Sequence, residues 1–124
     1  MPTVQTKKIL LVEDEPDILE LFAVRLEING FEVVQASDGS EAMESVKKMD
    51  PDLIVLDLML PKIDGYELCR MLRFEDKTTD VPIIILSALT QDYNKEKAFE
   101  VGATEYLTKP LDLSLLVEKI NEYI

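Results

Sequence analysis

In the stretch PDLIVLDLMLP one carboxylate, Asp57, interrupts the apolar run from Leu53 to Leu60. A carboxylate that is buried without a partner is very costly. Asp57 therefore either reaches water at the end of a strand or lies where a negatively charged oxygen is needed. Two further carboxylates, Glu13 and Asp14, directly follow the apolar run ILLV. The similar placement suggests that these side chains act together.

These carboxylates predict a specific chemistry if the fold joins them to the hydroxyl of Ser87 and the ammonium of Lys109. Three neighbouring carboxylates repel one another and raise each other's pKa. A divalent cation and Lys109 would relieve this repulsion, since charges of −3, +2 and +1 sum to zero. Oxygen ligands favour Mg²⁺, and the chain has no histidine. Mg²⁺, a lysine and a hydroxyl can clamp a phosphoryl group, and a carboxylate within the clamp can form an aspartyl phosphate.

Apolar periodicity predicts five strands, each followed by a helix. The predicted strands lie at residues 8–13, 31–37, 51–57, 81–88 and 104–108. The predicted helices lie at residues 16–30, 39–50, 64–75, 92–102 and 112–124. Such alternation implies a parallel sheet with helices on both faces. The continuous apolar runs LIVL and IIIL are typical of strands that are buried on both faces.

The candidate site residues all lie at the carboxyl ends of predicted strands, where open α/β sheets bind their ligands. Glu13 and Asp14 end the first strand, Asp57 the third, Ser87 the fourth and Lys109 the fifth. We therefore expect them to converge on one edge of the sheet. Asp57 is the best-placed nucleophile, because it is central and alone on its strand.

Composition limits the classes of function. A chain of 124 residues fits one domain with a proper core. The net charge of −12 argues against a nucleic-acid surface and against an anionic membrane face. The single cysteine, Cys69, fits a reducing compartment, and we find neither a signal peptide nor a membrane-spanning run. We expect a flexible tail over residues 1–6, one domain over residues 7–124 and a cytoplasmic location.

Four stretches occur in order along the chain: LLVEDEP, DLIVLDLMLPKIDGYEL, VPIIILSA and GATEYLTKP. With them, residues 7–124 resemble a receiver domain of bacterial two-component response regulators, the CheY-like family. The resemblance implies a doubly wound, flavodoxin-like (βα)5 fold of class α/β, with a five-stranded parallel sheet in the order 2-1-3-4-5.

The resemblance also implies a function. It indicates a phosphorylation-dependent signalling switch, not an enzyme, that catalyses only its own phosphoryl transfer and dephosphorylation. The implied donor is a sensor histidine kinase or a phosphotransfer protein. The implied recipient is a downstream effector protein or output domain, with no direct contact to nucleic acid or membrane.

The resemblance assigns a role to each acidic residue of the site. Asp57 resembles the phosphoacceptor. Glu13 and Asp14 resemble the acidic pair that holds Mg²⁺, with Asp57 and the backbone carbonyl of Met59 as further ligands. Glu13 stands where aspartate is commoner, and we expect its longer side chain to reach the metal through water.

The remaining assignments concern the phosphoryl group and the switch. Ser87 resembles the hydroxyl residue that bonds a phosphoryl oxygen, and Lys109 resembles the lysine that pairs with that group. The Lys109–Pro110 bond resembles the cis peptide of the family. Tyr106 resembles the aromatic switch that turns inward on activation, although a tyrosine on a short strand is also commonly half-buried for packing alone.

Three other functions compete with this interpretation. A Mg²⁺-dependent phosphohydrolase of the haloacid-dehalogenase type needs a second acid two residues after the nucleophile, where this chain has Met59. A flavin-binding domain needs a phosphate loop rich in Ser, Thr or Gly after the first strand, where EDEP would repel phosphate. A binding module that has lost phosphorylation would not need Ser87, Lys109 and the acidic pair.

Overall fold

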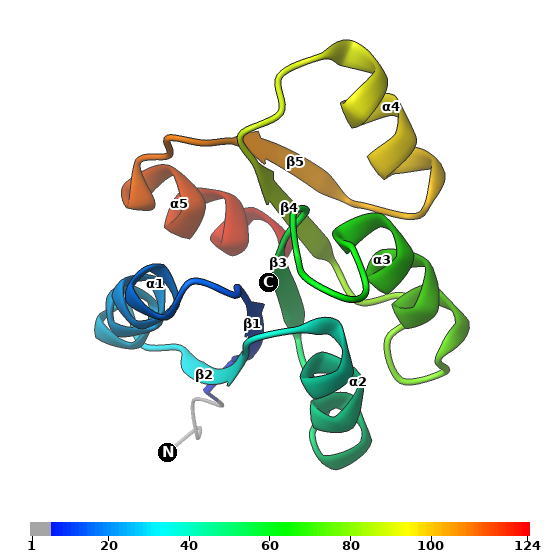
Figure 1. The fold of residues 1–124 in the computed structure, drawn as a ribbon. Coiled ribbons are helices and arrows are strands. Elements are labelled where there is room, and N and C mark those ends of the chain that lie inside the picture. Colours follow the sequence, from blue (N-terminus) through cyan, green and yellow to red (C-terminus); the bar gives the residue numbers. More distant parts are fainter. Residues whose placement is uncertain (1–5) are drawn as a thin grey trace.

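The computed structural model describes residues 6–124, in which five strands alternate with five helices (Figure 1). The strands are β1 (Lys8–Val12), β2 (Glu32–Ala36), β3 (Leu53–Asp57), β4 (Ile83–Ser87) and β5 (Glu105–Thr108). The helices are α1 (Pro16–Ile28), α2 (Gly39–Lys48), α3 (Gly65–Phe74), α4 (Asp92–Glu100) and α5 (Leu113–Tyr123). None of these helices of the described part is both long and apolar enough to span a membrane. The predicted alternation is confirmed; of the expected N-terminal tail, residues 1–5 lie outside the described part.

The five strands form one sheet in the order β2-β1-β3-β4-β5, and every neighbouring pair is parallel. This is the order that the family resemblance implied. Val12 near the end of β1 is level with Leu56 in β3, and Ser87 is level with Thr108 in β5. The carboxyl ends of the strands therefore meet at one edge of the sheet.

Helices cover both faces of the sheet (Figure 1), with α1 and α5 on one face and α2, α3 and α4 on the other. Successive residues of a strand point to opposite faces. Ile9 and Leu11 accordingly pack with α1 and α5, whereas Leu10 and Val12 pack with the helices of the other face. Burial on both sides explains the continuous apolar runs in the central strands.

The first turn of α3 lies directly against the end of β3. Asp64 caps this helix by accepting a hydrogen bond from the Glu67 amide at 2.9 Å, and the Gly65 amide donates to the Leu58 carbonyl at 2.8 Å. A Cβ atom on Gly65 would lie 2.5 Å from the Leu58 Cα and 2.8 Å from the Asp57 carbonyl oxygen. Only glycine fits here, so the backbone after Asp57 and the start of α3 form one packed unit.

We predict that Gly65→Ala lowers the free energy of unfolding by roughly 2–3 kcal/mol, because the added methyl group overlaps with backbone atoms that have no room to move. The control is Gly30→Ala, where φ is +93° and nothing lies within 4 Å of the added atom. That change carries only the backbone cost of about 1 kcal/mol. Urea denaturation of both variants gives the comparison, and equal losses would contradict the close packing at Gly65.

Candidate functional site

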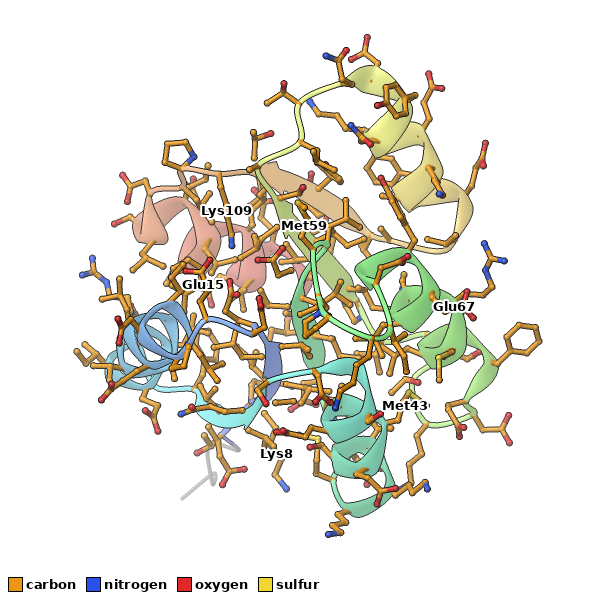
Figure 2. All side chains as sticks on the ribbon, viewed as in Figure 1. Lys8, Glu15, Met43, Met59, Glu67 and Lys109 are labelled. Carbon is orange, nitrogen blue, oxygen red and sulfur yellow. The ribbon has the colours of Figure 1, made fainter. Side chains whose placement is uncertain are left out.

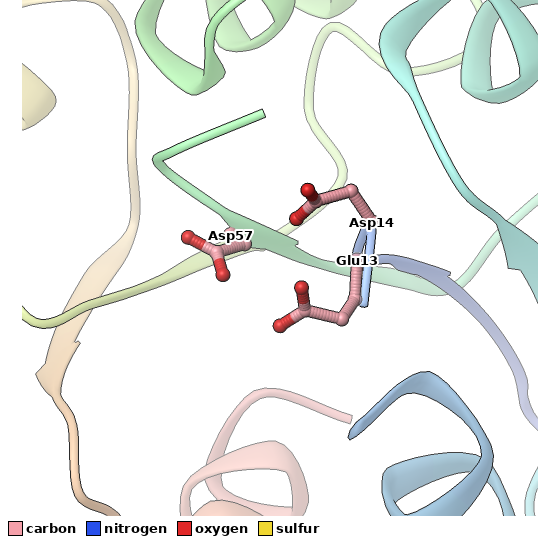
Figure 3. A group of neighbouring side chains, drawn as sticks. All are labelled: Glu13, Asp14 and Asp57. Atoms are coloured by element: carbon pink, nitrogen blue, oxygen red, sulfur yellow. The ribbon is translucent and has the colours of Figure 1, made fainter. Parts of the chain in front are cut away.

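Three carboxylates meet at the carboxyl edge of the sheet (Figure 3). Glu13 and Asp14 directly follow β1, and Asp57 is the last residue of β3. One oxygen atom from each side chain lies within 4.8 Å of the others. Glu13 is only 3 % exposed and Asp57 9 %. The structure thus brings together the three acids that the sequence placed at strand ends.

The side chain of Lys109 joins two of these acids. Lys109 directly follows β5 (Figure 2), and its Nζ atom lies 2.7 Å from Asp57 Oδ2 and 2.9 Å from Glu13 Oε1. Its backbone amide donates to the Ser87 carbonyl at 2.7 Å, and the Lys109–Pro110 peptide is cis, as the resemblance implied. The lysine is therefore fixed by its backbone as well as by its charge.

The charges of this cluster do not balance, since three carboxylates and one ammonium leave a formal charge of −2. Burial raises the pKa of Glu13 to about 7, against the lowering effect of its hydrogen bond to Lys109. Burial alone would lower the pKa of Lys109, but hydrogen bonds to Asp57 and Glu13 outweigh it and raise that pKa. The cluster has both the charge deficit and the oxygen donors that suit a divalent cation such as Mg²⁺.

Backbone amides orient the buried carboxylates. The Met59 amide donates to Asp57 Oδ1 at 2.9 Å, and the Glu15 amide donates to Glu13 Oε2 at 3.1 Å. The Met59 side chain itself is 62 % exposed (labelled in Figure 2). The observed contact with Asp57 is thus made by the Met59 backbone amide, whereas the resemblance assigned metal binding to the Met59 carbonyl, which stays a prediction.

A cavity of about 390 Å³ opens onto the cluster. Its lining comprises Asp14, Glu15, Ile18, Asp57, Met59, Ala88 and Lys109. Sequence analysis did not identify Glu15 and Ile18 as part of this site. The sequence held one signal for them, namely their position at the start of the helix after β1. That helix begins at the same edge of the sheet as the acids, so its first residues lie close to the site. The cavity gives a small anionic group a route to Asp57 and Lys109.

Ser87 and Tyr106 both contact the backbone of Leu89, in the loop between β4 and α4. Ser87 is fully buried, and its Oγ accepts a hydrogen bond from the Leu89 amide at 3.0 Å. Tyr106 is 7 % exposed, and its hydroxyl donates to the Leu89 carbonyl at 2.8 Å. Tyr106 thus occupies the inward position, and both predicted switch residues meet at the start of one loop.

Comparison with known proteins agrees with this geometry. Residues 9–121 match the sequence model of the response regulator receiver domain. Over 114 residues the chain is 42 % identical to a protein of Synechocystis named DNA-binding dual master transcriptional regulator RpaA. That match covers 92 % of this chain but 47 % of the relative, so the chain spans about half of the relative's length.

Solved structures show the same fold. The chemotaxis protein CheY4 of Vibrio cholerae has a TM-score of 0.93 at 29 % identity, covering 97 % of this chain and all of that one. The receiver domain of the sensor histidine kinase PA1611 from Pseudomonas aeruginosa, with a magnesium ion in its active site cleft, has a TM-score of 0.88 at 31 % identity, covering 96 % and 98 % of the two chains. The sequence match, the fold and the cluster of acids at the sheet edge all agree. The chain therefore belongs to the response regulator receiver domain family.

Proposed function

We propose that Asp57 accepts a phosphoryl group from the phosphohistidine of a sensor histidine kinase or phosphotransfer protein. The observation that carries this proposal is the position of the Asp57 carboxylate, paired with Lys109 at 2.7 Å and lining the open cavity. In the reaction a carboxylate oxygen of Asp57 bonds to phosphorus, the nitrogen–phosphorus bond breaks, and the imidazole leaves with a proton taken from solvent. Lys109 then pairs with the transferred group.

We further propose that Mg²⁺ is the resident metal. Glu13, Asp14, Asp57 and the backbone carbonyl of Met59 would hold it, and the formal charge of −2 around the three clustered acids supports a divalent cation. The magnesium ion in the cleft of the PA1611 receiver domain supports the same choice. When bound, Mg²⁺ supplies positive charge to a transferring phosphoryl group.

The proposed signal passes through Ser87 and Tyr106. Ser87 turns from the Leu89 amide toward the phosphoryl oxygen, and space opens behind it for the inward position of the Tyr106 ring. The surface formed by α4, β5 and α5 then changes for an effector or output domain. The chain also hydrolyses its own aspartyl phosphate, which resets the switch.

The relatives are named as transcriptional regulators. Because this domain is strongly acidic, we assign contact with DNA to a part of the regulator other than this domain. The buried thiol of Cys69, the single cysteine of the chain, supports a cytoplasmic site of action.

Asp57→Asn should abolish phosphoryl uptake, because an amide oxygen is a far weaker nucleophile than a carboxylate oxygen. Intact mass after incubation with acetyl phosphate and Mg²⁺ should show one phosphoryl group on the wild type, labile to hydroxylamine, and none on Asp57→Asn. The matched control is Asp76→Asn, which removes an exposed carboxylate in the loop after α3.

An Asp57→Asn protein that is phosphorylated as fast and as fully as the wild type would overturn the assignment of the phosphoacceptor. Catalytic turnover of a small phosphate ester by the wild type would instead favour a phosphohydrolase.

Lys109→Gln should separate metal binding from phosphoryl transfer. Loss of the ammonium makes the formal charge of the cluster more negative, so Mg²⁺ should bind roughly tenfold more tightly. The rate of phosphorylation by acetyl phosphate should fall by about 10²-fold, since the transferring group loses a preorganised cation. Calorimetric Mg²⁺ titration and the mass assay measure the two effects, with the exposed Lys48→Gln as control. Unchanged Mg²⁺ affinity would show that Lys109 does not share the metal site.

Glu13 should make the stability of the metal-free protein depend on pH. Its pKa is about 7 in the folded state and 4.5 as a free side chain. Between these values the folded state keeps a proton that the unfolded chain releases, so stability falls as pH rises toward 7. We expect the free energy of unfolding to fall by about 1–3 kcal/mol between pH 5 and pH 8 in EDTA. Glu13→Gln should lack this part of the loss, whereas the exposed control Glu118→Gln should keep it; equal pH slopes for the wild type and Glu13→Gln would contradict the assignment.

A further inference from the structure

A groove of about 710 Å³ lies between α3 and α4 (Figure 1). The two helices run in the same direction beside it. Tyr66 near the start of α3 contacts Asn94 near the start of α4, and Arg73 near the end of α3 contacts Gly102, just beyond α4. None of the three clustered acids lines this groove. Its role is therefore separate from the metal and phosphoryl chemistry.

Two exposed aromatic side chains line this groove, one from each helix. Phe74 at the end of α3 is 84 % exposed, and Tyr93 in the first turn of α4 is 67 % exposed. They are the most exposed aromatic side chains among residues 6–124. Val101, which is buried, also belongs to the lining. Aromatic side chains that gather at one hollow of the surface are typical of a place that a partner covers.

The two walls of the groove also carry charges of opposite sign that have no ion-pair partner. The ion pairs within residues 6–124 leave out Arg70 on α3 and both Glu96 and Glu100 on α4. The other two cations of the lining are engaged: the Arg73 guanidinium donates to backbone carbonyls, and Lys97 Nζ lies 4.4 Å from the centroid of an aromatic ring. One cation on α3 and two carboxylates on α4 are thus open to a partner.

The spacing of these carboxylates fits a helix. Glu96 and Glu100 are four residues apart, so they lie on one side of α4 at a distance of about 6 Å. Basic residues one turn apart on a neighbouring helix have the same interval. Helix α4 has nine residues, which corresponds to a length of about 13 Å, so two to three turns of a partner helix would cover the groove.

The charge of the domain distinguishes between possible occupants. A nucleotide or another phosphorylated ligand would meet the two carboxylates of α4, which repel it. A second copy of this chain would bring another net charge of −12 toward the first. A partner with basic residues is instead attracted by that charge.

We propose that the groove between α3 and α4 is a docking site for an amphipathic helix of a partner protein. Apolar side chains of this helix pack between Phe74 and Tyr93. Basic residues on one flank pair with Glu96 and Glu100, and an acidic residue on the other flank pairs with Arg70. The contact needs no phosphoryl group, so it is independent of the proposed switch.

A synthetic helix is the probe for this site. It is a stapled peptide of about 15 residues, or roughly four turns. Trp and Leu form one stripe, Lys residues one turn apart form one flank, and Glu residues form the other. A second peptide has the same apolar stripe but Gln on both flanks. Because the chain has no tryptophan, Trp fluorescence of the peptide reports binding. The charged peptide should bind the wild type about tenfold more tightly than the neutral one.

Phe74→Ala should weaken binding of the charged peptide roughly tenfold or more, which is the loss expected for an aromatic anchor of an interface. The matched control is Phe99→Ala, which removes an exposed ring of α4 outside the groove. This control should bind the peptide as the wild type does.

Glu96→Lys combined with Glu100→Lys should also weaken binding of the charged peptide by roughly tenfold, since like charges then face each other. Binding of the neutral peptide should stay within about twofold of the wild type. Glu118→Lys combined with Glu122→Lys makes the same change of net charge at exposed positions of α5. This control should leave the affinity for the charged peptide within about threefold, because distant exposed charges are screened by salt.

Equal affinities of the wild type and Phe74→Ala, or of the wild type and the double variant of α4, would overturn the proposal. A dissociation constant above about 1 mM for the charged peptide would do the same. Sedimentation of the chain alone tests the other occupant: a dimer that Phe74→Ala abolishes would assign the groove to a second copy and also overturn the proposal. The assay contains neither Mg²⁺ nor a phosphoryl donor, so its result does not depend on the role of Asp57.

Discussion

The arrangement of the site depends on the attraction between one ammonium and two buried carboxylates. Lys109 holds Asp57 and Glu13 at 2.7 and 2.9 Å, and so connects the ends of β5, β3 and β1. Removing charged groups from water is costly, and pairing offsets that cost only in part. The raised pKa of Glu13 is the sign of the remaining cost. Ion pairs therefore hold this edge of the sheet together, but the edge still carries more negative than positive charge. This excess of negative charge favours the binding of a cation.

A rigid sheet makes such an edge possible. Residues such as Ile54 and Ile84 are fully buried between two layers of helices, and their burial stabilises the domain by far more than the acidic cluster costs. The close contact of Gly65 with the Asp57 carbonyl extends this rigidity into the first turn of α3. The loop after β4 is by contrast exposed at Ala88, Thr90 and Gln91. We therefore assign the proposed switching movement to this loop and not to the strands.

Much of this arrangement could be predicted from the sequence, because it follows from periodic patterns. Apolar runs predict the strands, and the strand ends predict that Asp57 and Lys109 meet. The strand order came from the family resemblance, since periodicity does not determine it. Two contacts of α3 could not be predicted, namely the hydrogen bond from the Arg73 guanidinium to the Gly102 carbonyl and that from the Tyr66 hydroxyl to Asn94. Side-chain hydrogen bonds between distant parts of the chain have no periodic signature in the sequence. The inward position of Tyr106 is also decided by packing, because a strand pattern permits a half-buried ring to lie on either side.

The division between fixed and movable parts decides where the effect of a new charge goes. A phosphoryl group on Asp57 would add about one negative charge to an edge that is already short of positive charge. The strands cannot move in response to this charge, because their side chains are packed on both faces of the sheet. In the proposed switch Ser87 donates its hydroxyl proton to a phosphoryl oxygen, and the Leu89 backbone, which bonds both Ser87 and Tyr106, adjusts with it. The change must then be expressed in the loop that leads into α4. A local charge is in this way converted into a change of surface shape, while the core of the domain keeps its packing.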